Sequence, residues 1–70
     1  MSKAYADIVA ATAGLRVALK AAGMSDGIVV ELSANDAEKL EGIVPEAHIG
    51  RSTAWGRYCD IAGATYKLED

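Results

Sequence analysis

The chain has 70 residues, a net charge of −3 and a pI of about 4.9, and 51% of its residues are apolar. This length accommodates one small domain over residues 1–70, and the acidic balance lacks the basic patch typical of nucleic-acid-binding proteins. No stretch reaches the roughly 18 uncharged apolar residues of a membrane span. We therefore expect a cytoplasmic protein that binds neither nucleic acid nor a membrane.

Stability is a constraint for so short a chain, because a single core of this size rarely supplies more than about 3–5 kcal/mol. Cys59 is the single cysteine and His48 the single histidine, so neither an internal disulfide nor a structural zinc site with its usual four Cys/His ligands can form. Oligomerisation is the supplement that remains. We therefore expect a homo-oligomer without metal or cofactor.

Residues 3–22 are predicted to form a helix, with Ser2 as its N-cap and Gly23 just beyond its end. Apolar positions three and four residues apart predict an inward stripe: Tyr5, Ile8, Thr12, Leu15, Leu19 and Ala22. A second ridge of small residues follows the opposite side: Ala6, Ala10, Ala13, Val17 and Ala21. This ridge has two interpretations, an exposed face on which alanine simply favours the helix or a helix–helix contact across a dimer.

A strand and a second, shorter helix are predicted next. Ile28 to Leu32 is rich in β-branched residues, which suit a pleated surface. Ser33 and Asp36 have the spacing of a capping box. Because Pro45 disfavours helical geometry at the residue before it, the helix should end near residue 41 or 42.

The C-terminal part carries the clearest β pattern. Trp55 to Ile61 and Ala64 to Glu69 alternate between apolar and polar positions, which predicts a hairpin with residues 62–63 as its turn. In this register Ile61 pairs with Ala64 and Cys59 with Tyr66. Residues 45–54 are the least regular stretch and are interpreted as a loop that contains at most a short extended piece.

The element order is therefore helix, strand, helix, strand, strand. We predict an α+β fold with a small three-stranded sheet, antiparallel or mixed, and both helices packed on its apolar face. Both edges of such a sheet would be open, and open edges invite pairing with another chain. This is a second reason to expect self-association.

Possible sites for chemistry gather in the segment 45–57, where His48, Arg51 and Trp55 occur. A catalytic His48 would need a nucleophile and an orienting carboxylate, but no nucleophile-elbow or Cys-x-x-Cys motif surrounds it. Cys59 lies on the apolar face of the hairpin, where a free cysteine behaves as a small hydrophobic side chain. Catalysis is therefore not expected.

The function predicted from these features is a non-catalytic protein–protein interaction module that binds itself and a second, unidentified protein. The interaction residues expected are Ala6, Ala10, Ala13, Val17, His48, Arg51 and Trp55. Short chains rich in alanine and glycine are common in bacteriophages, which suggests a viral accessory protein, either an assembly factor or an inhibitor of a host protein. The alternative is a small enzyme or ligand-binding domain that uses the loop 45–57.

Overall fold

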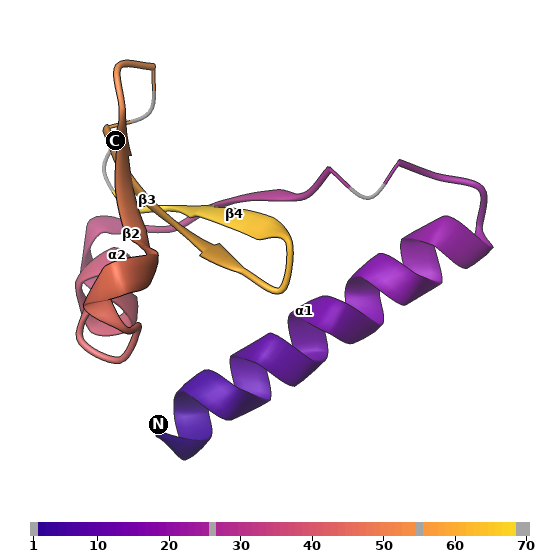
Figure 1. The fold of residues 1–70 in the computed structure, drawn as a ribbon, viewed down its shortest axis with the longest axis horizontal. Coiled ribbons are helices and arrows are strands. Elements are labelled where there is room, and N and C mark those ends of the chain that lie inside the picture. The colour runs from indigo at the N-terminus through magenta and orange to yellow at the C-terminus, as the bar shows by residue number, and fades with distance from the viewer. Residues whose placement is uncertain (1, 26, 55, 69–70) are drawn as a thin grey trace.

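The computed structural model describes residues 2–25, 27–54 and 56–68 of the chain (Figure 1). Within these residues two helices and a short 3-10 turn accompany four strands. They follow in the order α1 (Lys3–Ala21), β1 (Val29–Glu31), α2 (Ala34–Glu41), η1 (Glu46–His48), β2 (Ile49–Ser52), β3 (Gly56–Ile61) and β4 (Ala64–Lys67). The fold is α+β, as the sequence predicts.

The sheet is mixed and has the strand order β1-β4-β3-β2. β1 runs parallel to β4, and the other two pairs are antiparallel. The prediction of three strands is wrong, because Ile49–Ser52 pairs with β3 along its whole length. This strand lies in the segment predicted to be a loop with at most a short extended piece. The Tyr58 side chain lies over Gly50 on the neighbouring strand, where a Cβ atom would come within 2.8 Å of the ring. Glycine within a strand often marks such a close approach.

The C-terminal hairpin has the predicted register. Ile61 pairs with Ala64 and Cys59 with Tyr66. The turn residues Ala62 and Gly63 both have positive φ angles, of 50° and 87°. Two positive φ angles in a two-residue loop match the right-handed twist of the strands that the loop joins.

Side-chain caps begin both helices where the sequence predicts them. The Ser2 hydroxyl accepts a hydrogen bond from the Tyr5 amide of α1 at 3.1 Å, and the Ser33 hydroxyl accepts one from the Asp36 amide of α2 at 3.2 Å. Each bond satisfies one of the amides that a helix start leaves without a backbone partner. α2 ends at Glu41 with Gly42 as its C-cap, in agreement with the expected effect of Pro45.

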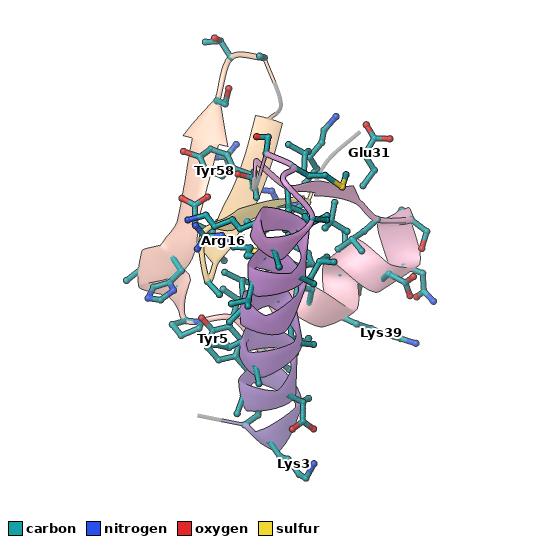
Figure 2. All side chains as sticks on the ribbon, turned by 90° about the vertical axis from the view of Figure 1, so that its right-hand side faces the viewer. Lys3, Tyr5, Arg16, Glu31, Lys39 and Tyr58 are labelled. Atoms are coloured by element: carbon teal, nitrogen blue, oxygen red, sulfur yellow. The ribbon has the colours of Figure 1, made fainter. Side chains whose placement is uncertain are left out.

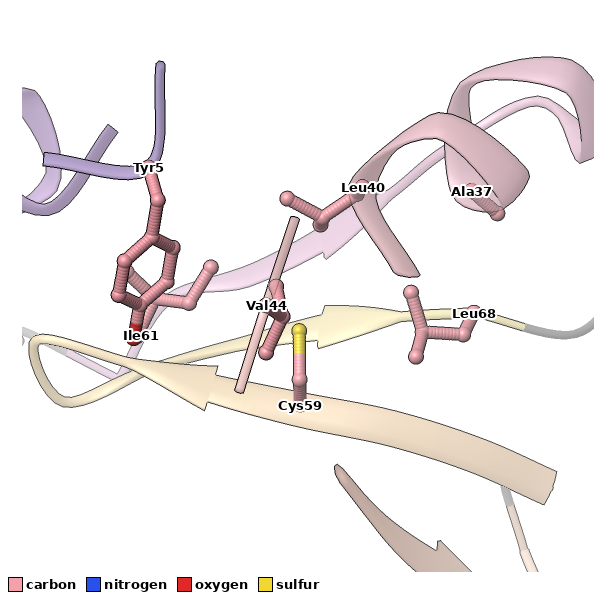
Figure 3. Packing of buried hydrophobic residues seen from close by; sticks show 7 residues of the cluster. All are labelled: Tyr5, Ala37, Leu40, Val44, Cys59, Ile61 and Leu68. Atoms are coloured by element: carbon pink, nitrogen blue, oxygen red, sulfur yellow. The ribbon is translucent and has the colours of Figure 1, made fainter. Parts of the chain in front are cut away.

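The core lies between the two helices and one face of the sheet (Figure 3). Its buried apolar members come from α1, α2, the segment after α2, β3 and the residue after β4: Tyr5, Ala37, Leu40, Val44, Cys59, Ile61 and Leu68. Both helices thus cover the same face of the sheet, as predicted. The two largest fully buried side chains are those of Ile61 and Cys59.

The inward side of α1 differs from the predicted stripe. Tyr5 and Thr12 are buried as expected, but Leu15 is 48% exposed. Its place toward the sheet is taken by Arg16, whose guanidinium donates a hydrogen bond of 2.7 Å to the carbonyl of Ala62 at the hairpin turn. Because one residue corresponds to about 100° of rotation in a helix, turning Arg16 inward turns Leu15 away from the sheet.

Neither helix within the described residues has the length and apolar character needed to cross a bilayer.

Candidate functional site

An apolar groove of about 520 Å³ lies between α1 and α2. The two helices stand beside each other on the same side of the sheet, with Lys39 of α2 at the outer border (Figure 2). The walls and floor of the groove are formed by residues of both helices and of the sheet region: Ala4, Ile8, Ala11 and Thr12 of α1, Leu40 and Ile43 in and after α2, and Leu32 and Tyr66. At the groove, apolar residues of the core and its margin are accessible to solvent.

The polar groups at the floor of the groove bind each other. The hydroxyls of Thr12 and Tyr66 lie 2.7 Å apart, and Thr12 is only 4% exposed. A buried hydroxyl without a partner would destabilise the fold, and here each hydroxyl is the partner of the other. Because the two groups bind each other, the floor acts as an apolar surface. The groove therefore suits an apolar side chain.

The border of the groove is partly charged and partly apolar. Asp36 and Lys39 of α2 line one side and are both exposed. On the other side, Leu15 of α1 continues the line of Ile8 and Ala11 beyond the groove. An apolar channel between two helices with charges at its border is the kind of surface on which amphipathic helices dock.

The predicted small-residue ridge lies on the other side of α1. Ala6, Ala10, Ala13 and Val17 are all exposed, and Val17 reaches 69%. They point away from the sheet, because Tyr5 and Thr12 on the opposite side are buried. α1 thus has two exposed apolar surfaces, the ridge and the wall of the groove.

His48 and Arg51 do not share a site. The Nδ1 atom of His48 lies 3.2 Å from the Tyr5 hydroxyl, and His48 borders a hollow with Tyr58 and Asp60. Arg51 borders a different hollow, which Glu41 and Glu46 also line. Trp55, the third residue expected there, lies outside the described residues.

The hollow around Arg51 is balanced in charge. Arg51 lies directly opposite Arg57 in the register of β2 and β3. Like charges in this position repel each other, but Arg57 forms an ion pair with Glu41 of α2, and Glu46 also lines the hollow. The carboxylates oppose the binding of an anion between the two guanidinium groups.

Cys59 and Ser52, which could serve His48 as nucleophiles, do not line the hollow that His48 borders. Cys59 is fully buried in the core, and burial, together with the neighbouring charge of Asp60, raises the pKa of its thiol to about 11. At neutral pH the thiol is protonated and is a poor nucleophile or metal ligand. The Ser52 hydroxyl accepts a hydrogen bond of 3.1 Å from the Ala54 amide. Among the described residues, no group of three or more His, Cys, Asp or Glu side chains is placed to hold a metal ion.

The groove itself was not among the sites predicted from the sequence. Its signal is present in the spacing of Ala4, Ile8, Ala11 and Leu15, which are four, three and four residues apart. This spacing predicts an apolar line along the helix. Its larger residues, Ile8 and Leu15, belong to the predicted inward stripe, whereas Ala4 and Ala11 do not. Only the packing of Arg16 against the hairpin shows that the line is displaced from the core.

Comparisons with protein families, with curated proteins and with solved structures found no match to this chain.

Proposed function

We propose that this chain is a non-catalytic protein-interaction module that associates with a second copy of itself. The observation that carries the proposal is the uncovered apolar groove between α1 and α2, together with the half-exposed Leu15 at its end. Removing apolar surface from water lowers the free energy by about 25 cal/mol per Å². Binding of a second chain in a groove that is continuous with the core would bury this apolar surface and lower the free energy.

The extent of the surface supports the proposal. The chain exposes 4579 Å², whereas a compact monomer of its mass exposes roughly 4,200 Å². Its radius of gyration is 12.2 Å, compared with about 11 Å expected for 70 residues. Both differences agree with a helix α1 that lies against the sheet along only part of its length (Figure 1).

The sheet edges offer a second, smaller surface for association. β1 and β2 are the outer strands of the described sheet and have three and four residues. Short edge strands form few hydrogen bonds with another chain. We therefore assign the association to the helices.

The test is sedimentation velocity over about a hundredfold range of protein concentration. We expect the weight-average mass to rise reversibly from 7.3 kDa toward twice that value. A mass that stays at 7.3 kDa up to sub-millimolar concentration contradicts the proposal.

A wider role in the cell, as an accessory protein that assists assembly or inhibits another protein, would use the same surface. The partner in that role would compete with self-association. Addition of the true partner should therefore convert the dimer into a mixed complex that contains one copy of this chain.

A further inference from the structure

We propose that the groove receives α1 of a second copy, with the two α1 helices antiparallel about a two-fold axis near Ala11. This inference rests on the proposed function and states which surface mediates it. In such an arrangement each chain provides the same surface to the other, as in most homodimers.

The spacing of exposed residues on α1 supports a helix as the occupant. An apolar line along α1 starts at the groove with Ala4, Ile8 and Ala11 and continues beyond it with Leu15 and Ala18, in alternating steps of four and three residues. This is the repeat with which two helices pack along a common seam. Alanine at every second position allows the two backbones to approach closely.

The position of Leu15 supports the antiparallel direction. The groove lies beside the first half of α1, at Ala4, Ile8 and Ala11, whereas Leu15 lies one turn beyond Ala11. About an axis at Ala11, the Leu15 side chain of one copy faces residues 7 and 8 of the other. Each Leu15 then enters the groove of the other chain, next to Leu40 and Ile43. A parallel pair would leave both Leu15 side chains beyond the groove.

The charge pattern allows this contact. No charged residue occurs from Ile8 to Leu15, the middle of α1. In an antiparallel pair the positive start of each helix also lies beside the negative end of the other. The contact therefore meets no repulsion along its centre.

The area indicates a weak dimer. A helix of 19 residues is about 28 Å long and presents a face about 10 Å wide. Because the face that α1 inserts is also the α1 wall of its own groove, this helix contributes roughly 300 Å² per chain, compared with about 800 Å² per partner in a standard interface. We therefore expect reversible association rather than a permanent dimer.

Two matched variants test the surface. Leu15→Lys and Val17→Lys each add one positive charge at an exposed apolar residue of α1, and Val17 is the more exposed of the two. Val17 points away from the groove, so it is the control. We expect Leu15→Lys to raise the dissociation constant at least tenfold in sedimentation velocity and Val17→Lys to change it less than twofold. Circular dichroism checks that both variants are folded.

The outcomes separate this inference from the proposed function. If Val17→Lys dissociates the dimer and Leu15→Lys does not, the interface is the ridge, and the groove assignment is overturned while self-association stands. If neither variant acts, the groove assignment is likewise overturned. A wild-type chain that remains monomeric overturns both, and binding of the apolar dye anilinonaphthalene sulfonate to that monomer would point to a small apolar ligand.

Cross-linking tests the direction. Single cysteines are introduced by Ala11→Cys or Ala4→Cys in a Cys59→Ala background. In the antiparallel pair the two copies of residue 11 are adjacent, whereas the two copies of residue 4 are about 21 Å apart along the axis. We expect fast disulfide formation for Ala11→Cys and little for Ala4→Cys. Equally fast disulfide formation at both positions would indicate a parallel pair, and slow formation at residue 11 would show that the seam lies elsewhere; either result overturns the proposed arrangement.

Discussion

Two glycines show how differently the same residue type is used in this chain. Gly63 has a φ of 87°, and a Cβ atom there would collide with the guanidinium of Arg16. Gly14 lies inside α1, and a Cβ atom there would meet nothing within 4 Å. Glycine is required at the first position and reduces helix stability at the second.

Alanine substitutions at these two positions should therefore act in opposite directions. Gly63→Ala strains the turn and displaces Arg16, so we expect it to lower the free energy of unfolding by more than about 1 kcal/mol. Gly14→Ala removes the entropic cost of glycine in a helix, so we expect a gain of about 0.5–1 kcal/mol. Urea unfolding at low protein concentration measures both. A loss of stability in Gly14→Ala would contradict the open space found around that residue.

Cys59 allows a prediction about pH and reactivity. Its thiol is buried and its pKa is raised from 9.0 to about 11, mainly by burial. Because the folded state favours the protonated thiol, the associated stability is fully present below pH 9 and is lost as the pH rises toward 11. The stability advantage of the wild type over Cys59→Ala, measured by urea unfolding, should therefore shrink between pH 9 and 11.

The same burial should protect the thiol from modification. At pH 8 we expect a disulfide reagent to react with Cys59 only as fast as the protein opens, so that urea accelerates the reaction in proportion to the unfolded fraction. Rapid labelling of the folded protein would show that the hairpin opens independently of the rest of the chain.

At the scale of elements, polar side chains along one side of α1 join this helix to the rest of the fold. Tyr5 contacts His48, Thr12 contacts Tyr66, and Arg16 binds the hairpin turn. Tyr5 and Arg16 appear on the same side of the helix in Figure 2. The Thr12–Tyr66 pair is the middle contact and also forms the floor of the groove.

A double-mutant cycle should show that this pair is coupled. Tyr66→Phe leaves the buried Thr12 hydroxyl without its partner, and we expect it to cost about 1–2 kcal/mol. In the double variant Tyr66→Phe with Thr12→Val, no hydroxyl is left without a partner, so the total cost should be smaller than the sum of the two single variants. Urea unfolding of the four proteins gives the coupling. Strict additivity would show that the two hydroxyls do not depend on each other.

The elements that the sequence predicted well are those with a local signal. The hairpin follows from strict alternation on both sides of Ala62 and Gly63, and the helix starts follow from Ser2 and Ser33. Strand β2 lacks such a signal, because Gly50 is a poor strand former and the segment becomes a strand by pairing with β3. The groove was missed for a similar reason, since a contact between Arg16 and a turn 46 residues away sets the rotation of α1.

At the scale of the molecule, stability is distributed unevenly. The fully buried side chains Cys59 and Ile61 lie in β3, at the centre of the sheet, next to Ala64 in β4. On α1, by contrast, residues 17–21 are exposed except for Leu19. The end of α1 is thus less covered than the centre of the sheet, and most of the stability of a helix in a protein comes from tertiary packing.

Hydrogen exchange should show this division and its change on association. At low concentration we expect the amides of β3 to exchange most slowly and those of residues 17–21 to exchange much faster, because a frayed helix end opens without global unfolding. When the concentration is raised into the range of self-association, the proposed contact covers the line from Ala4 to Ala18. The amides of α1 should then become more protected, while those of β3, already limited by global unfolding, change by a smaller factor. Equal protection of α1 and β3 at low concentration would show that the chain opens as a single unit, with α1 held as firmly as the sheet.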